Sequence, residues 1–217
     1  MLELTLRIAL VAMVINLPVA LVVSWILVKT SFRGRFILDM LVSLPLALPP
    51  VAIGFFLLLL LGRGGPIGAV VHGLLGFDIM FTWVAAALAS AVVSFPLVAR
   101  AIMVAMGTVD STLEMSARSL GAGPIRVIFT VTIPLAYRGI LAGVLLGFVR
   151  AISEFGATIT VAGNIPGRTQ TLPLAMYSSV QLRDDVTALW LAIISITLAV
   201  VTLLVHNWLL AKTTRLT

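Results

Sequence analysis

The chain has 217 residues, of which 61% are hydrophobic and only 10% are charged. An average soluble domain is about 45–50% apolar and about 25% charged, so the composition excludes an ordinary soluble fold, and it also excludes disorder, which needs low hydrophobicity and high charge. The net charge is +6, from 14 Lys and Arg against 8 Asp and Glu. There is no cysteine, which excludes disulfides, thiolate catalysis, zinc–cysteine sites and iron–sulfur clusters.

Five windows of the sequence are apolar and long enough to cross a bilayer, which takes about 20 residues. They are residues 8–28, 37–61, 79–99, 139–161 and 186–210. We therefore expect an all-α, polytopic membrane protein with about five transmembrane helices. A single transmembrane domain would occupy residues 1–217, with its core at about residues 5–210.

The connecting segments alternate in basic charge, and this alternation orients the spans. Nine basic residues would lie on one side of the membrane: Lys29, Arg33, Arg35, Arg100, Arg118, Arg126, Arg138, Lys212 and Arg215. Four would lie on the other side: Arg7, Arg63, Arg168 and Arg183. Because cytoplasmic loops carry the excess of Lys and Arg, we expect the N-terminus outside and the C-terminus inside.

The second span contains three prolines, Pro45, Pro49 and Pro50. Each proline removes a backbone donor and bends or breaks a helix, and in hydrocarbon the freed carbonyls must be satisfied by protein or by water in a cavity. Two interpretations stay open. The prolines produce a packing kink, or the span is a broken helix that borders a path or moves as a gate.

The fourth span contains two charged residues, Arg150 and Glu154. They are four residues apart, so in a continuous helix they share a face. Charges within a membrane are costly and usually face a bundle interior or a cavity. The two residues form either a structural ion pair or a polar element of a translocation path, and these interpretations are compatible if the pair fixes a gate.

The outer segment after the fourth span begins with turn-forming residues and then becomes helical in pattern. Leu172, Met176 and Val180 recur at helical spacing. We expect a short amphipathic or half-inserted helix at the outer mouth.

The longest cytoplasmic segment, residues 100–138, contains a short helix with clear start and stop signals. Ser111 and Glu114 have the spacing of a capping box, in which the glutamate reaches back to the cap amide, and Gly121 offers a C-terminal cap. We expect this helix at residues 110–121. It either docks a soluble partner or packs against its own bundle.

The same segment resembles the EAA loop of ABC importer permeases. That pattern is Glu-Ala-Ala, three residues, Gly, nine residues and Ile-x-Leu-Pro. Here Met115-Ser116-Ala117, Gly121 and Val131-Thr132-Ile133-Pro134 keep the spacing throughout, although the triplet is degenerate and Glu114 stands one place earlier.

Other segments resemble the molybdate permease subunits of this family. They are the run Glu154-Phe155-Gly156-Ala157-Thr158-Ile159-Thr160, the run from Gly163 to Pro173, and Leu44–Val51 with its three prolines. The resemblance covers about residues 5–210. The sulfate and thiosulfate permeases share the layout and remain an alternative, but the runs Phe-Gly-Ala-Thr-Ile-Thr and Thr-x-Thr-Leu-Pro favour molybdate.

The resemblance implies the type I ABC importer permease fold. A homodimer of permeases would form the path, two copies of an ABC ATPase would bind below it, and a periplasmic binding protein would deliver molybdate or the similar tungstate. The short helix would insert into the ATPase, with Glu114 capping the helix, Ala117 and Leu120 contacting the partner, and Gly121 turning the chain away. Alternating access would be gated by residues of the second and fourth spans: Pro45, Pro49, Pro50, Arg150, Glu154 and Thr158.

The chain has no Gly-x-x-x-x-Gly-Lys-Ser/Thr phosphate-binding loop. We therefore expect that it is not an enzyme, that it binds no cofactor or metal, and that Mg-ATP is used by the partner ATPase. The expected place is the bacterial inner membrane, with no nucleic-acid partner.

Two rival classes fit the sequence less well. An ion-coupled secondary transporter would usually carry internal repeats and several intramembrane acids, whereas Glu154 is the one clear acid within a span. An intramembrane enzyme needs convergent polar groups, and His72 and His206 are expected at opposite sides.

Overall fold

The computed structural model describes residues 1–213, and for residues 212 and 213 it describes the backbone alone. The side chain of Lys212 and the whole of Arg215 therefore lie outside the described residues. Every element of this part of the chain is a helix. In chain order the elements are α1 (Leu2–Lys29), α2 (Arg35–Ala47), α3 (Pro50–Leu61), α4 (Pro66–Leu75), α5 (Trp83–Gly107), α6 (Ser111–Ser119), α7 (Pro124–Val127), the π-helical turn η1 (Ile128–Thr132), α8 (Ile133–Ile152), α9 (Gly156–Ala162), α10 (Leu172–Gln181) and α11 (Asp185–Thr213).

Four helices are long and apolar enough to cross a membrane, and a bent pair of shorter helices makes a fifth crossing possible. The long helices span Leu2–Lys29, Trp83–Gly107, Pro124–Ile152 and Asp185–Ala211. The expectation of about five spans in an all-α fold is therefore confirmed. The third span extends beyond residue 99 to Gly107.

The bent pair is the second predicted span, and it is broken rather than kinked. The helix axis bends by 113° between α2 and α3. Pro49 is the N-cap of α3 and Pro50 is its first residue, a position where the missing amide costs nothing because the first helical amides have no intrahelical acceptor. Each half has only 12 or 13 residues, about 20 Å of helix. This is too short to cross the hydrocarbon core alone.

The fourth predicted span begins earlier than residue 139, because α7, η1 and α8 form one continuous stretch of 29 residues from Pro124. Pro134 lies in this stretch, and in a regular α-helix its ring would crowd the carbonyl of Thr130. The wider turn of η1, in which the Ile133 amide bonds to the Ile128 carbonyl, accommodates the proline. Much of the segment that the sequence assigns to a cytoplasmic loop is therefore helix.

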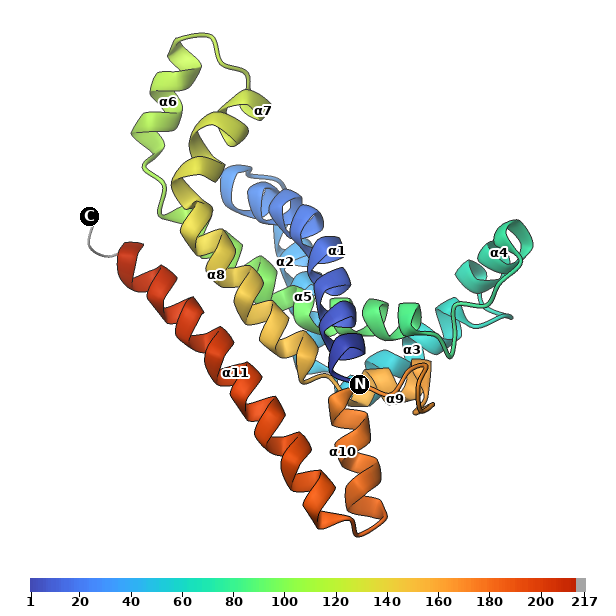
Figure 1. Cartoon of the computed structure of the whole chain (residues 1–217). Coiled ribbons are helices and arrows are strands. Elements are labelled where there is room, and N and C mark those ends of the chain that lie inside the picture. The colour runs from blue at the N-terminus through green and yellow to red at the C-terminus, as the bar shows by residue number, and fades with distance from the viewer. Residues whose placement is uncertain (214–217) are drawn as a thin grey trace.

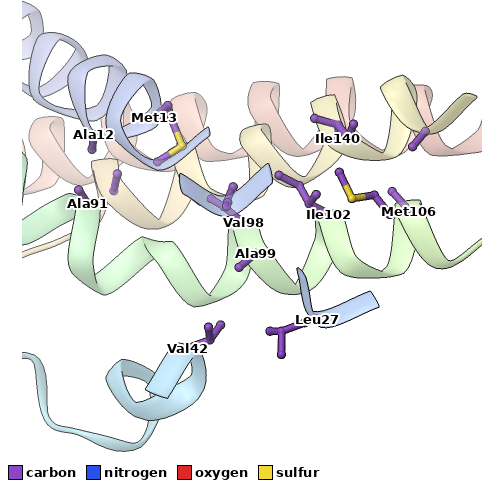
Figure 2. Close-up of a cluster of buried hydrophobic side chains, with 14 of the residues drawn as sticks. Ala12, Met13, Leu27, Val42, Ala91, Val98, Ala99, Ile102, Met106 and Ile140 are labelled. Atoms are coloured by element: carbon purple, nitrogen blue, oxygen red, sulfur yellow. The ribbon is translucent and has the colours of Figure 1, made fainter. Parts of the chain in front are cut away.

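α5 is the central helix of the bundle. Figure 2 shows Val98, Ile102 and Met106 of α5 in a buried apolar cluster with Met13 of α1 and Ile140 of α8. Apolar packing of this kind has little net driving force in lipid, so membrane helices also rely on small residues and hydrogen bonds.

Polar side chains join α1 to α5. The Asn16 side-chain amide donates to the Ala91 carbonyl and to the Ser94 hydroxyl, both at 3.0 Å. The Ser24 hydroxyl donates to the Ala99 carbonyl, also at 3.0 Å. All of these groups are buried, so each bond satisfies a donor that lipid could not.

A ridge of three glycines on α8 allows close approach to α5. A Cβ atom on Gly139 would lie 2.5 Å from the Cβ of Ala105, and one on Gly143 would lie 2.7 Å from the Cβ of Ala101. Gly147 meets Val98 in the same way. The four-residue spacing places all three on one helix face, which is the small-residue contact that membrane helices favour.

The elements separate between two ends of the bundle. The C-terminal ends of α1 and α11 lie toward the end that carries α6 and α7, in the upper part of Figure 1. The N-terminus, α9 and α10 lie toward the other end. This arrangement agrees with the alternation expected from the basic residues, whereas the membrane orientation itself stays a prediction.

The glycine ridge makes a testable prediction. Gly143→Val should lower the stability of the purified protein by about 1–3 kcal/mol, because the added atoms overpack the contact with α5. For a chain of this size the thermal unfolding midpoint should fall by roughly 3–10 °C. Gly73→Val on α4 is the matched control, since a Cβ there meets no atom within 4 Å. Equal midpoints for the two variants would contradict the proposed packing.

Candidate functional site: a carboxylate-held helix break and an exposed capped helix

Glu154 lies in a break between two helices. α8 ends at Ile152 and α9 begins at Gly156. The prediction of one helix over residues 139–161, with Arg150 and Glu154 on a shared face, is therefore wrong. No proline marks the break, and the apolar pattern continues across it, so hydropathy alone did not reveal it.

The Glu154 carboxylate joins the two helices. Its Oε1 accepts a hydrogen bond of 2.8 Å from the Ala157 amide in the first turn of α9. Its Oε2 lies 2.8 Å from Nη1 of Arg150, in the last turn of α8. An anion at a helix N-terminus and a cation at a helix C-terminus both oppose the end charges of the backbone dipoles. The predicted pairing of Arg150 with Glu154 is confirmed, and the Glu154 side chain is only 1% exposed.

The break after α8 lies against the break between α2 and α3. A Cβ on Gly156 would lie 3.0 Å from the Cβ of Pro50. A Cβ on Gly54, one turn along α3, would lie 2.8 Å from the Ala157 carbonyl oxygen. Figure 1 shows the short helices α3 and α9 side by side. The two interruptions that the sequence singles out separately thus form one contact.

The three prolines take different places around this contact. Pro50 packs on α9 through Gly156. Pro49 caps α3, and Pro45 lies inside α2, near its C-terminal end. The structure therefore brings Pro50 together with the segment of Glu154, and the other two prolines shape the bend.

Thr158 lies on the buried face of α9 and is 1% exposed. Within the described chain its hydroxyl oxygen has no hydrogen-bond partner. A buried polar group without a partner typically costs about 1–3 kcal/mol, and such groups call for a structural or functional reason. The sequence selected Thr158 as a gate residue, and its isolated hydroxyl next to the α3–α9 contact is compatible with that role.

The loop after α9 is tied to the helix that follows it. The Asn164 side-chain amide donates to the Ser178 hydroxyl at 2.6 Å, and the Leu172 amide donates to the hydroxyl of Thr5 at the start of α1, at 2.9 Å. The short helix expected after the fourth span is confirmed as α10, whereas its place at the outer mouth stays a prediction.

An apolar cavity of about 430 Å³ lies between the end of α8, α10 and α11. Phe155, the residue after Glu154, lines this cavity. Its ring centroid lies 5.0 Å from that of Tyr177 on α10. The backbone break therefore borders the close contact with α3 and also borders open space.

The short cytoplasmic helix expected at residues 110–121 is present as α6, but its cap differs from the prediction. The Asp110 carboxylate, rather than Ser111, accepts a hydrogen bond of 2.8 Å from the Thr112 amide. This bond lowers the pKa of Asp110 below its ordinary value. The capping-box prediction is therefore wrong, because Glu114 turns away from the helix start.

The C-terminal end of α6 is built as the sequence predicts. Gly121 has a left-handed backbone with φ of 85°. Its amide bonds to the Arg118 carbonyl, and the amide of Ala122 bonds to the carbonyl of Ala117. These are the two bonds of a Schellman motif, which ends a helix and turns the chain.

α6 presents apolar side chains to its surroundings. Leu120, the C-cap residue directly after α6, is 90% exposed, and Leu113 and Met115 within α6 are also exposed. Ala117 is half-buried. Isolated exposed apolar residues are ordinary, but here they gather on a nine-residue helix with firm caps at both ends.

Glu114 is the buried side chain of α6. Its Oε1 lies 2.9 Å from Nζ of Lys29, the last residue of α1, and accepts a hydrogen bond of 2.7 Å from the hydroxyl of Thr132 in η1. Sequence reasoning missed Lys29 and Thr132 as partners. No local spacing relates three such distant positions, although an acid beside apolar helical positions is a weak signal of a buried contact.

Comparison with known proteins places these features in a family. The family described as "Binding-protein-dependent transport system inner membrane component" matches residues 16–215. The chain is 46% identical over 207 residues to the molybdenum transport system permease protein ModB of Escherichia coli K12, covering 95% of this chain and 90% of the relative. It is 34% identical over 212 residues to the sulfate transport system permease protein CysW of a Synechocystis strain, covering 98% and 76%.

The fold also matches a solved structure. The MetNI methionine ABC transporter, in an inward-facing conformation, contains a chain that superposes with a TM-score of 0.74 at 14% sequence identity, covering 97% of this chain and 93% of that one. At this low identity the likeness concerns the fold, which is that of a type I ABC importer permease. The chain belongs to the family of inner-membrane components of binding-protein-dependent transport systems.

Proposed function

We propose that the chain is the transmembrane permease subunit of an ATP-driven molybdate importer. The observation that carries this proposal is its 46% identity to a molybdenum transport permease across almost the whole length of both chains. The 34% identity to a sulfate permease, which matches 76% of that relative, favours sulfate less. Tungstate, which resembles molybdate in size and charge, is a second substrate of the same path.

The assembly would contain two copies of this chain, two copies of a separate ABC ATPase that uses Mg-ATP, and a periplasmic molybdate-binding protein. It would lie in the bacterial inner membrane, with the N-terminus outside and the C-terminus inside. The end of the bundle that carries α6 would then be cytoplasmic, which agrees with the excess of basic residues there. The chain itself performs no catalysis.

α6 would be the contact with the ATPase. Leu120 and Ala117 supply apolar surface, and the Schellman turn at Gly121 returns the chain to the bundle. A rigid, capped helix loses little conformational entropy when it binds, which favours docking.

The contact between α3 and α9 would be the gate. Alternating access requires two arrangements of a packed element, with ATP and loaded binding protein each favouring one of them. The glycine contacts at Gly54 and Gly156 hold α3 and α9 at close range, and the adjoining helix breaks allow both short helices to move against their longer neighbours. Thr158 lies next to this contact, and such a movement would give its buried, unpartnered hydroxyl access to a hydrogen-bond partner.

Reconstitution of the permease with its ATPase and binding protein in liposomes tests this function. Molybdate-loaded binding protein should stimulate ATP hydrolysis and drive uptake of molybdate, and tungstate should compete with it. Stimulation by sulfate alone would replace the molybdate assignment by a sulfate one. Uptake driven by an ion gradient without ATP would contradict the assignment of the protein to an ATP-driven importer.

A substitution in α6 tests the docking role. Leu120→Asp should weaken association with the ATPase at least about 30-fold, because loss of a central apolar contact costs 2 kcal/mol or more. Co-purification of the two subunits measures this loss. Leu182→Asp, at another highly exposed leucine after α10, is the matched control and should leave co-purification unchanged. Normal molybdate uptake by the Leu120 variant would exclude docking through α6.

A double-mutant cycle tests the role of the Glu154 carboxylate. Glu154→Gln retains an acceptor for the Ala157 amide but leaves the Arg150 guanidinium without its anion, so transport should fall at least tenfold. Arg150→Met with Glu154→Gln should be more stable than either single variant, with a coupling energy of about 1–3 kcal/mol. The exchange Arg150→Glu with Glu154→Arg should not restore transport, because the amide of α9 then loses its acceptor. Normal uptake by Glu154→Gln would rule out a gating role for the charge.

A further inference from the structure

Glu114 is the one buried side chain of the helix α6. Glu114 is 6% exposed, whereas the other residues of α6 are exposed or half-buried. A cleft of about 620 Å³ lies beside it, between the end of α1, the connection from α5 and α6 itself. Apart from Glu114, the side chains of α6 therefore have room to move relative to the bundle.

The Glu114 carboxylate holds two different membrane helices. Its Oε1 contacts Nζ of Lys29 at 2.9 Å and the hydroxyl of Thr132 at 2.7 Å. The side chains of Lys29 and Glu114 are only 14% and 9% exposed. Water screens such a pair little, and a hydrogen bond to a charged acceptor is stronger than one between neutral groups. The contact is therefore stiff, and it joins α6 to α1 and η1 at a single oxygen atom.

Thr132 lies at a special place in its helix. It is the last residue of the π-helical turn η1, and from there α8 continues without interruption to Ile152, a length of roughly 30 Å. The far end of α8 carries Arg150, which holds Glu154 and with it α9. π-turns within α-helices are frequent at functional sites. A displacement of Glu114 would thus act on one end of α8, and the other end of α8 holds the predicted gate.

We propose that Glu114 is a positioning residue that transmits movement of α6 to α1 and α8 through Lys29 and Thr132, and is not itself a contact with the ATPase. This inference rests on the proposed docking of α6. It divides α6 into an outward part, with Leu113, Met115 and Leu120, that binds the partner, and one inward carboxylate that moves the membrane helices.

The test uses the complete importer with Thr132→Val and Lys29→Met. Valine keeps the shape of threonine but cannot donate to Glu114, and methionine keeps much of the length of lysine without its charge. Co-purification with the ATPase and basal ATP hydrolysis should stay within about twofold of the unchanged protein. The amount of molybdate imported per ATP hydrolysed should fall at least tenfold. Thr132→Ser and Lys29→Arg, which keep the donor or the charge, should restore most of it.

A merely structural role predicts a different result. If the contact only supports folding, the thermal unfolding midpoint, co-purification with the ATPase, the rate of ATP hydrolysis and the rate of molybdate import should all fall together. That parallel loss would overturn the inference. Unchanged import per ATP in both variants would overturn it as well. The proposed docking fails separately, when Leu120→Asp keeps its association with the ATPase. Thr130→Val, which removes an exposed hydroxyl two residues before Thr132, is the control for changes to this helix in general.

Discussion

The constraint on which this structure depends is that a backbone amide inside an apolar bundle needs a partner from the protein itself. Lipid offers none, so an interrupted membrane helix is tolerated where side chains replace the lost bonds. Glu154 meets this requirement between α8 and α9, because its carboxylate accepts from an amide of one helix and pairs with a cation on the other. The break between α2 and α3 is handled differently, by placing Pro50 where a helix needs no donor. The two solutions adjoin, and their contact is the most distinctive feature of the fold.

A second carboxylate, that of Glu114, joins helices at the other end of the molecule. There too one carboxylate joins segments that the chain does not connect directly, and there too its partners are a cation at the end of a helix and a donor on a second helix. The continuous stretch Pro124–Ile152 runs between these two carboxylates. The chain has only 8 acidic residues, and two of them, Glu114 and Glu154, hold neighbouring helices at the two ends of this stretch. This placement is the structural basis of the proposed link between the two ends.

The sequence predicted the helical class, the number of crossings and the position of α6, because hydropathy and the turn at Gly121 are local signals. It also predicted the pairing of Arg150 with Glu154, but it placed both residues on one continuous helix, whereas α8 ends at Ile152. The break at Glu154 escaped prediction because Ser153-Glu154-Phe155-Gly156 interrupts a helix without lowering the surrounding hydropathy. α4 was missed although Pro66 at its start and Gly76 after its end are the signals of a short helix. Lys29 and Thr132 could not be found, because a contact between distant segments leaves no mark on local spacing.

The π-turn η1 has a consequence for how the length of the stretch Pro124–Ile152 can change. A π-turn contains one residue more than the α-turn that it replaces, so the extra residue is taken up within the turn Ile128–Thr132. Loss of a single residue from this turn would convert it to regular helix, and α8 would keep the face that it presents to α5. Gly139, Gly143 and Gly147 would then stay against α5. The strain of such a deletion would fall on Pro134, whose ring needs the wider turn.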